Sequence, residues 1–287
     1  MCSRPILIAI LLLGGLTGSF FAGRSFPRVP KVAVDPKQEV PANRGLDANL
    51  YIQTAAEYRA CCFQAYNLAS FRLKERLATE TVEKKDAKFA VIMDLDETVF
   101  DNGVHQATQL RGNLAYDQAK WDEWEEFHGD QVTLIPGAKD FILEAEKLGV
   151  SVVYISNRND RFCEQTTAVL KRLELPLPSN DFLKLSSTTS NKTTRREEVD
   201  SKFFVLLLIG DNLRDFDDEF RARELKDKTP EELTAAIQER KATVDKERAK
   251  FGDRWIILPN PAYGEWQKPL GQGNQVFDRL VPSIRTK

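Results

Sequence analysis

Four apolar runs divide the central and carboxyl-terminal parts of the chain. They read FAVIMDL from Phe89, VSVVYIS from Val150, FFVLLLIGD from Phe203 and WIILPNP from Trp255. Continuous apolar runs of this length are typical of parallel strands that are buried on both faces. We therefore expect four strands of one parallel sheet.

Helical segments separate these runs. Residues 138–148 precede the second run, residues 161–173 follow it, and residues 195–199 precede the third. This alternation predicts an α/β fold with a doubly wound, mainly parallel sheet and right-handed crossovers. In such sheets, ligands bind beyond the carboxyl ends of the strands.

The region before the first strand has a different pattern. Residues 46–79 contain neither proline nor glycine and carry positions at helical spacing, which predicts one long helix or two shorter ones. We group residues 46–80 with a segment of about 112–136 as a small helical subdomain. Both belong to one predicted domain, residues 46–287.

The amino terminus is more apolar than the rest of the chain. Residues 5–23 carry no charge, and Arg4 and Arg24 flank them. Two interpretations fit this length over residues 1–23, a signal peptide or a single membrane anchor. Positive charge before the segment favours export of the chain that comes after it, and the proline-rich residues 24–45 read as a linker. We expect a periplasmic, cell-surface or secreted protein, which contacts the membrane through this segment only if the segment is an anchor and is not cleaved.

Composition narrows the chemistry. Lys and Arg total 41 against 43 Asp and Glu, so the net charge of -2 offers no general attraction for a nucleic acid polymer or an anionic lipid surface. Two histidines leave little material for a multi-histidine metal site, and the four cysteines form no disulfide framework. An anionic ligand must therefore be bound locally.

Carboxylates gather directly after the predicted strands. Asp94 and Asp96 follow the first, Ser156 lies at the end of the second, and Asp211 and Asp215 follow the third. Carboxylates this close repel one another, so they persist where a cation neutralises them or where the loop is solvated. Mg²⁺ takes carboxylate and carbonyl oxygens and often bridges to a substrate phosphate.

A basic segment, SNKTTRRE, lies between the second and third of these clusters and contains Lys192 and Arg195. Lys192 could balance excess negative charge at such a site. Each group also has a structural interpretation: Asp94 and Asp96 as caps of the next element, the basic residues as solvated charges, and residues 215–219 as an acidic surface turn. A single site for a divalent cation and a phosphate accounts for all of them together.

These segments resemble a known family. DLDET is similar to the D-x-D-x-T motif of the haloacid dehalogenase superfamily, and Ser156, Lys192 and GDNLRD resemble its second, third and fourth motifs in order. DLDETVFDN, YISNR, GDNLRDF, LPNPAYGEW and QTAAEYRA together resemble the class C acid phosphatases, which include the lipoprotein e type of 5'-nucleotidase. The resemblance covers roughly residues 46–266.

The resemblance implies a phosphoric monoester hydrolase that uses an aspartyl-phosphate intermediate. It implies that Asp94 is the nucleophile and Asp96 the general acid, which later activates water. Ser156 would donate a hydrogen bond to a phosphoryl oxygen, and Lys192 would stabilise the charge on the transferring group.

A magnesium site is implied as well. Mg²⁺ would bind the Asp94 carboxylate, the Asp96 backbone carbonyl and Asp211, with Asp215 as a further ligand or support. Two rival functions remain open: a phosphate- or nucleotide-binding protein without turnover, and a phosphotransferase that passes the phosphoryl group to an alcohol.

Recognition of a nucleobase would fall to aromatic side chains. Trp121, Trp124 and Tyr263 could stack on a base or could pack in the core. The family's first motif continues to a tyrosine, whereas His105 stands at that position here. The expected partner is a small phosphomonoester, possible substrates include nucleoside 5'-monophosphates, and a homo-oligomer is left open.

Overall fold

Three of the four predicted strands form the centre of a five-stranded parallel sheet in the order β5-β4-β1-β6-β7, and the fourth, β7, forms one edge. The structure, a computed structural model, describes residues 44–83, 87–222, 229–271, 275–276 and 279–280, all within the unit Gln38–Val281. The prediction of a doubly wound, parallel α/β fold is confirmed. The strands of this sheet are β1 (Phe89–Met93), β4 (Ser151–Asn159), β5 (Leu183–Ser186), β6 (Phe204–Gly210) and β7 (Trp255–Ile257).

The edge strand β5 is not predicted by the apolar pattern. It reads LKLS, and only Leu183 is fully buried. It pairs in parallel with β4, the strand that the second apolar run predicts. An edge strand that is half-buried lacks the continuous apolar run by which the central strands are recognised.

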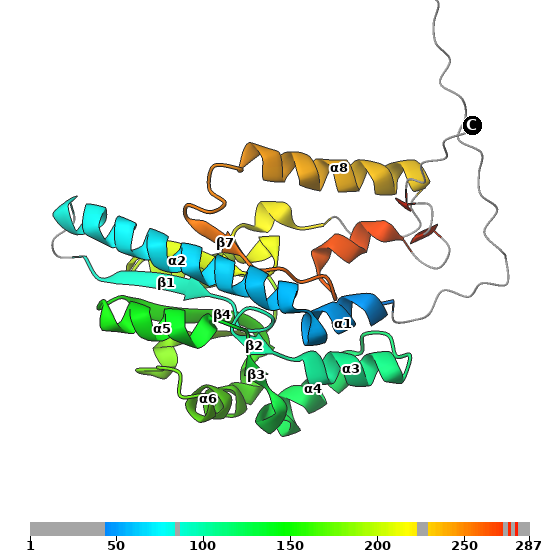
Figure 1. Cartoon of the computed structure of the whole chain (residues 1–287), viewed down its shortest axis with the longest axis horizontal. Helices are drawn as coiled ribbons and strands as arrows, with labels where there is room; N and C mark the ends of the chain where they lie inside the picture. Colours follow the sequence, from blue (N-terminus) through cyan, green and yellow to red (C-terminus); the bar gives the residue numbers. More distant parts are fainter. Residues whose placement is uncertain (1–43, 84–86, 223–228, 272–274, 277–278, 281–287) are drawn as a thin grey trace, which may run out of the picture. The chain divides into compact units, whose positions relative to one another are not determined.

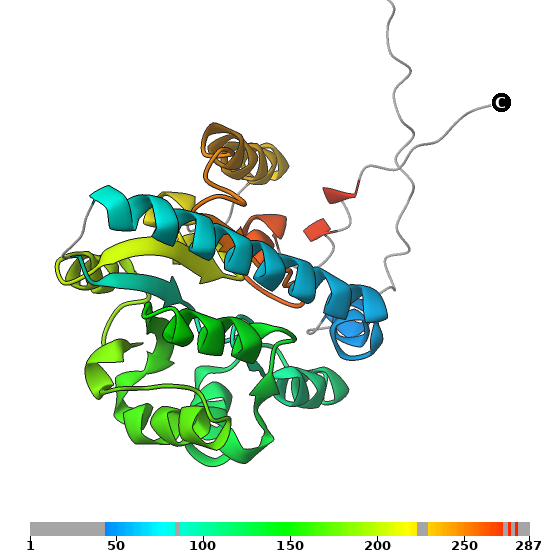
Figure 2. The ribbon, with the colours of Figure 1, turned by 60° about the vertical axis from the view of Figure 1, so that its left-hand side comes forward.

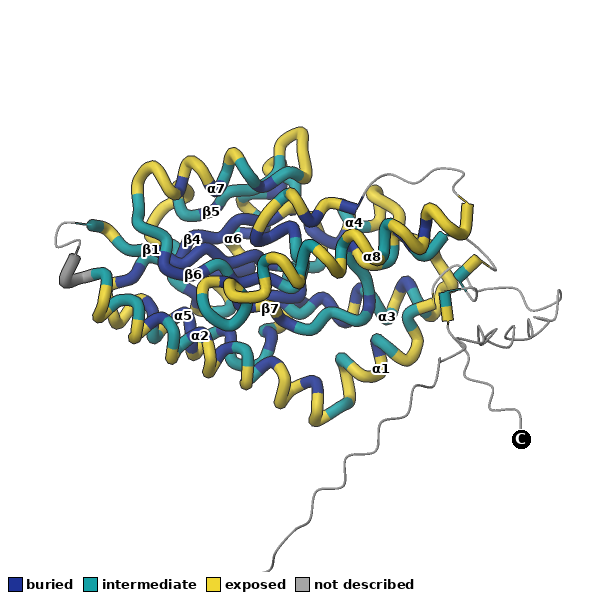
Figure 3. Tube along the Cα trace, turned by 90° about the horizontal axis from the view of Figure 1, so that it is seen from above, coloured by how far each residue is buried: buried dark blue, intermediate teal, exposed yellow. Residues whose placement is uncertain are grey.

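Helices cover both faces of the sheet. Among the described residues, two helices that contact each other pack on one face, and a third helix packs on the other. Figures 1 and 2 show α2 (Ala56–Glu83) lying along the sheet. Figure 3 shows the strands as a buried layer between helices with exposed outer sides. In chain order they are α2 (Ala56–Glu83), α5 (Ala138–Lys147) and α7 (Thr193–Asp200).

Side chains of β1 alternate between the two apolar layers. Val91 and Met93 pack in the larger core with residues of α2 and α5, whereas Ala90 and Ile92 pack in a smaller core with Val199 of α7. Successive side chains of a strand point to opposite faces, so both layers fix the register of β1. This register sets where the strand ends and where the following carboxylates begin.

A helical segment follows β1 and is framed by a short antiparallel pair of strands, β2 and β3. α1 packs against the first helix of this segment. These elements are α1 (Leu46–Thr54), β2 (Phe100–Asp101), α3 (Gly103–Arg111), α4 (Gln118–Phe127), a 3₁₀ turn η1 (Gly129–Gln131) and β3 (Thr133–Leu134).

The predicted subdomain groups residues 46–80 with this segment. α1 does contact α3, but α2 packs on the sheet, against β6 and β7. The cause is its apolar face, whose buried residues recur every three or four positions. They are Tyr58, Cys62, Tyr66, Ala69 and Leu73.

The remaining elements complete the connections between strands. α6 follows β4 and contacts α4, and α8 lies between β6 and β7 in the sequence and contacts two 3₁₀ turns. They are α6 (Cys163–Arg172), α8 (Pro230–Lys246), η2 (Asp160–Phe162), η3 (Asn180–Phe182), η4 (Leu213–Asp215), η5 (Asp218–Phe220) and η6 (Glu265–Leu270).

The predicted signal or anchor, residues 1–23, lies outside the described residues, as does most of the predicted linker. Within the described part of the chain, no helix is both long enough and apolar enough to cross a bilayer.

Candidate active site

The carboxyl ends of β1, β4 and β6 lie side by side and place the predicted site residues together. Asp94 is the first residue after β1, and its N–H donates to the carbonyl of Ile209 in β6 at 2.9 Å. The loop that follows turns sharply at Glu97, whose φ of 57° is uncommon for a residue other than glycine. The hydroxyl of Tyr66 in α2 donates to the carbonyl of Thr98 at 2.6 Å and anchors this loop.

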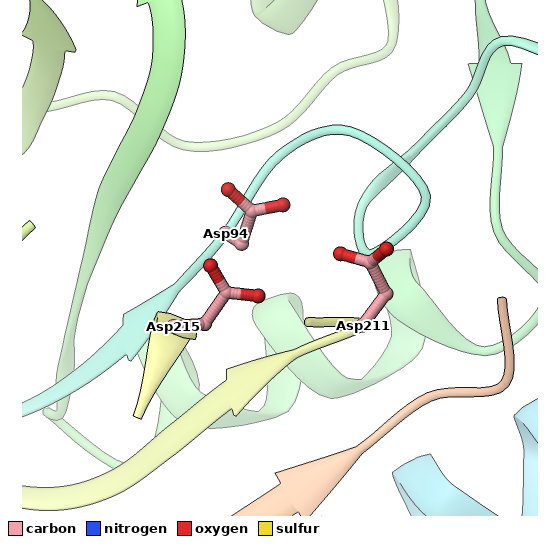
Figure 4. Close-up of side chains that lie close together, drawn as sticks. All are labelled: Asp94, Asp211 and Asp215. Carbon is pink, nitrogen blue, oxygen red and sulfur yellow. The ribbon is translucent and has the colours of Figure 1, made fainter. Parts of the chain in front are cut away.

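Three carboxylates converge at this end of the sheet. Asp94, Asp211 and Asp215 each offer an oxygen atom, and these atoms lie within 4.8 Å of one another. Figure 4 shows the three side chains together where β1 and β6 end. Gly210 permits this approach, because a Cβ atom at that position would overlap the side chain of Asp215.

Lys192 lies inside this cluster and is 4% exposed. Its Nζ donates to Asp94 Oδ1 and, at 2.8 Å, to Asp215 Oδ1. The other oxygen of Asp215 accepts the N–H of Asn212 at 2.9 Å, so η4 holds the carboxylate in place. The structure therefore brings together the four predicted residues that come from β1, β6 and the basic segment.

The cluster is short of positive charge. Burial raises the pKa of Asp94 well above its usual range. Lys192 lowers this pKa, but the negative charges of Asp215 and Asp211 raise it further. Burial and Asp215 raise the pKa of Asp211 to about 7. Burial alone would lower the pKa of Lys192, but Asp215 and Asp94 outweigh it and raise that pKa. One ammonium among three carboxylates fits a site for a divalent cation, which prefers oxygen ligands.

Asp96 has the opposite surroundings. Its Oδ1 accepts hydrogen bonds from Arg158 Nε and Asn102 Nδ2, each at 2.9 Å, and lies 2.8 Å from Arg158 Nη2 in an ion pair. Its Oδ2 accepts from Ser156 Oγ at 3.3 Å. Arg158 therefore neutralises the charge of the Asp96 carboxylate, and Ser156 lies beside this predicted general acid.

Three polar residues of the site, Arg158, Asn102 and Asn260, are not among the predicted ones. Arg158 is 1% exposed and pairs with Asp96, and Asn260 Nδ2 donates to Asp211 Oδ2 at 2.8 Å. A signal was present for Arg158, since an arginine at the end of a buried strand must be paired to stay there. Its neighbour Asn157 is exposed and accepts a hydrogen bond from Arg195.

The four predicted aromatic residues fall into two places. His105 of α3 contacts Trp121 and Trp124 of α4, whose ring centroids lie 5.2 and 5.3 Å from that of His105. Trp124 belongs to the large core, and its Nε1 donates to Asn102 Oδ1 at 2.9 Å. Burial lowers the pKa of His105.

Tyr263 lies apart from these three. It lines a cavity of about 760 Å³ between α2, α8 and β7, and Asp211 and Asn260 line the same cavity. The cavity therefore reaches the carboxylate cluster from the β6 side, whereas the other three aromatic residues lie on the helical segment after β1.

Comparison with known proteins gives concordant results. The family described as HAD superfamily, subfamily IIIB (Acid phosphatase) matches residues 25–266. A solved structure of the class C acid phosphatase from Bacillus anthracis is 31% identical and has a TM-score of 0.72, covering 85% of this chain and 99% of that chain. A structure of the class C acid phosphatase from Bacillus anthracis with tungstate bound is 30% identical, with the same TM-score and coverage.

The match runs through all the residues of the carboxylate cluster and its surroundings. It confirms the resemblance that the sequence motifs indicate, and the likeness of the two folds extends over nearly the whole relative. The chain belongs to subfamily IIIB, the acid phosphatases of the haloacid dehalogenase superfamily, and is a phosphomonoester hydrolase.

Proposed function

We propose that this chain is an exported, Mg²⁺-dependent acid phosphatase that hydrolyses phosphomonoesters, among them nucleoside 5'-monophosphates, through an aspartyl-phosphate on Asp94. One observation carries the proposal: the two carboxylates of the first motif have opposite surroundings. Asp94 lies in a cluster of excess negative charge with Asp211 and Asp215, whereas Asp96 forms an ion pair with Arg158.

Asp94 is the nucleophile in this proposal. Its carboxylate attacks phosphorus and forms an acyl phosphate while the bond from phosphorus to the leaving oxygen breaks. The ammonium of Lys192, which donates to Asp94 Oδ1, offsets the charge that the phosphoryl group brings into a buried site.

Asp96 exchanges protons with the leaving group and with water. It gives a proton to the leaving alkoxide, which departs as an alcohol. The carboxylate then takes a proton from a water molecule that attacks the phosphorus of the intermediate, which releases phosphate and restores Asp94. Both transfers balance, because the proton lost in the first step is regained in the second.

Ser156 contributes a donor for the phosphoryl group. Its Oγ donates to Asp96 Oδ2 at 3.3 Å, a long and therefore weak hydrogen bond that a phosphoryl oxygen can replace. The Bacillus anthracis relative with tungstate bound supports a pocket for a tetrahedral oxyanion in this family.

The carboxylates of Asp94, Asp211 and Asp215, with the backbone carbonyl of Asp96, would hold Mg²⁺. Their fit rests on the clustered oxygens and on the raised pKa values of Asp94 and Asp211, which a cation would reverse. When bound, the ion supplies positive charge that polarises the phosphoryl group.

Substrate preference and export rest on other parts of the chain. Tyr263 borders the cavity that reaches Asp211, so it is the predicted aromatic residue best placed to contact a nucleobase. The uncharged residues 5–23 support export, either as a cleaved signal or as an anchor.

The test is phosphate release by a protein that begins at Arg24, with Mg²⁺ or with a chelator. Substrates would be 5'-nucleotides, 3'-nucleotides, sugar phosphates and an aryl phosphate. We expect release that needs metal, is lost in Asp94→Asn and is unchanged in Asp245→Asn, an exposed position of α8. Release that continues in Asp94→Asn or in the chelator would contradict the proposal.

A further inference from the structure

Arg158 is a buried charged residue to which the proposed reaction assigns no step. We infer that Arg158, together with Asn102, positions the Asp96 carboxylate so that Oδ2 exchanges the proton with the leaving group and Oδ1 does not. This inference rests on the proposed function, in which Asp96 is the general acid. Arg158 is thus a positioning residue that acts through Asp96.

The two oxygens of Asp96 are hydrogen-bonded very differently. Oδ1 accepts two hydrogen bonds, from Arg158 Nε and from Asn102 Nδ2, each at 2.9 Å, and Arg158 Nη2 lies 2.8 Å away as an ion-pair contact. These two hydrogen bonds use the two lone pairs of a carboxylate oxygen, so Oδ1 has no direction left for a further hydrogen. Oδ2 accepts only the 3.3 Å hydrogen bond from Ser156 among the contacts found in the described residues. The proton must therefore travel through Oδ2.

Arg158 is itself held from several sides. Its guanidinium lies over the rings of Phe100 and Trp121, at 5.0 and 5.7 Å from their centroids. Its Nη2 also donates to Asn102 Oδ1 at 3.1 Å, and the same oxygen accepts Trp124 Nε1 at 2.9 Å. A guanidinium fixed in this way can hold a carboxylate in one orientation, because its donors form a rigid fork.

The backbone of Arg158 adds a link to the phosphate side of the site. Its N–H donates to Ser156 Oγ at 3.1 Å, and that hydroxyl in turn donates to Asp96 Oδ2. Ser156 therefore points its hydrogen at the oxygen that Arg158 leaves open. When a phosphoryl oxygen takes the Ser156 hydrogen bond, Oδ2 becomes free to face the leaving oxygen.

The effect of losing Arg158 should depend on the leaving group. An alkyl alcohol leaves only with a proton, whereas a nitrophenol leaves readily without one. Losing the orientation of Asp96 should slow the phosphorylation step for an alkyl ester and spare it for a nitrophenyl ester. General damage to the site would slow both esters alike.

The experiment measures single-turnover release of alcohol from an alkyl phosphate and from 4-nitrophenyl phosphate. Arg158→Gln removes the charge and the fork, and Arg158→Lys keeps the charge without the fork. We expect Arg158→Gln to slow the alkyl ester on the order of 100-fold and to leave the nitrophenyl ester near the wild-type rate. Arg158→Lys should show the same split, smaller in size, and Arg161→Gln, whose side chain is exposed, should leave both rates unchanged.

Thermal unfolding and Mg²⁺ binding would verify that each variant keeps its fold and its carboxylate cluster. If Arg158→Gln does not fold, the split in Arg158→Lys decides. Equal losses on both esters, or no loss on either, in a folded variant that binds Mg²⁺ would overturn the inference alone. A wild-type protein that releases neither alcohol would overturn the proposed function, and this inference with it.

Discussion

Asp94 and Asp96 lie two residues apart in one loop, yet their carboxylates are surrounded by groups of different charge. Asp94 shares the Lys192 ammonium with Asp215, next to the carboxylate of Asp211, and burial raises the pKa of Asp94 well above its usual range. Asp96 faces a guanidinium and a side-chain amide that each donate a hydrogen bond to its Oδ1.

The difference comes from the neighbouring strands. β6 and the turn after it supply carboxylates to Asp94, whereas β4 supplies Ser156 and Arg158 to Asp96. A carboxylate in a cluster with excess negative charge needs a cation. A carboxylate that is ion-paired with an arginine is held in one orientation. The site therefore has two halves: the Asp94 half consists of Asp94, Lys192, Asp211 and Asp215, and the Asp96 half consists of Asp96, Asn102, Ser156 and Arg158. Substitution, pH and metal can perturb these two halves separately.

The largest effect is expected for Lys192→Met, which removes the ammonium that Asp94 and Asp215 share. Breaking a buried ion pair leaves its partner charge uncompensated and costs about 3–5 kcal/mol of unfolding free energy. Denaturant unfolding in the presence of a chelator would measure this loss, and Mg²⁺ should recover part of it. Lys241→Met, at an exposed position of α8, is the matched control. An unchanged stability would show that the cluster does not depend on Lys192.

Glu125 tests the charge balance on the Asp96 half. It is 1% exposed, and burial raises its pKa from 4.5 to about 7. The folded protein therefore holds this proton over a pH range in which the unfolded chain has released it, so the free energy of unfolding falls as pH rises from about 4.5 to 7. A shift of this size corresponds to about 3 kcal/mol.

Glu125→Gln should flatten that fall while keeping the hydrogen bond from the N–H of Asn159, which the wild-type carboxylate accepts at 2.9 Å. Glu126→Gln, at the adjacent exposed position, should leave the pH dependence unchanged. Unfolding followed across this pH range checks both. An unaltered slope in Glu125→Gln would contradict the raised pKa.

Metal binding should distinguish the halves next. At a Mg²⁺ concentration 100 times its dissociation constant, the folded protein should gain about 2.7 kcal/mol of stability. Asp211→Asn should lose most of this gain, whereas Arg158→Lys should keep it. A melting temperature that responds to Mg²⁺ equally in both variants would mean that the ion is not held by the cluster shown in Figure 4.

The smallest effect is expected for Gly210→Ala. The added methyl group would overlap Asp215 and displace its carboxyl from the Asp94 half. Overpacking of this kind costs typically about 1–3 kcal/mol, and Mg²⁺ affinity should fall with it. Calorimetric titration with Mg²⁺ would measure the change. Unaltered affinity would show that Asp215 is not needed to hold the ion.

Much of the Asp94 half can be predicted from the sequence. Apolar runs locate β1 and β6, and because parallel strands present their carboxyl ends on one edge, Asp94 and Asp211 must lie close together. Lys192 and Asp215 join them from the segments that the family motifs indicate. The predicted roles of these residues stay predictions until activity is measured.

The Asp96 half was less accessible to sequence reasoning. The pairing of Arg158 with Asp96 spans 62 positions, and no local pattern specifies which carboxylate a buried arginine meets. The separation of Tyr263 from Trp121 and Trp124 likewise depends on how α3 and α4 pack after β1. Long-range packing decides both features, whereas local patterning decides the strands.

Trapping of the phosphorylated enzyme tests the division of roles between Asp94 and Asp96 most directly. Wild type, Asp94→Asn and Asp96→Asn would be mixed with 4-nitrophenyl phosphate and Mg²⁺, quenched in acid and digested, and the peptide that contains Asp94 would be weighed. We predict a phosphoryl group on Asp94 that accumulates in Asp96→Asn, because water activation is lost there, and none in Asp94→Asn. A phosphoryl group on another residue, or none in Asp96→Asn despite a burst of nitrophenol, would contradict the account.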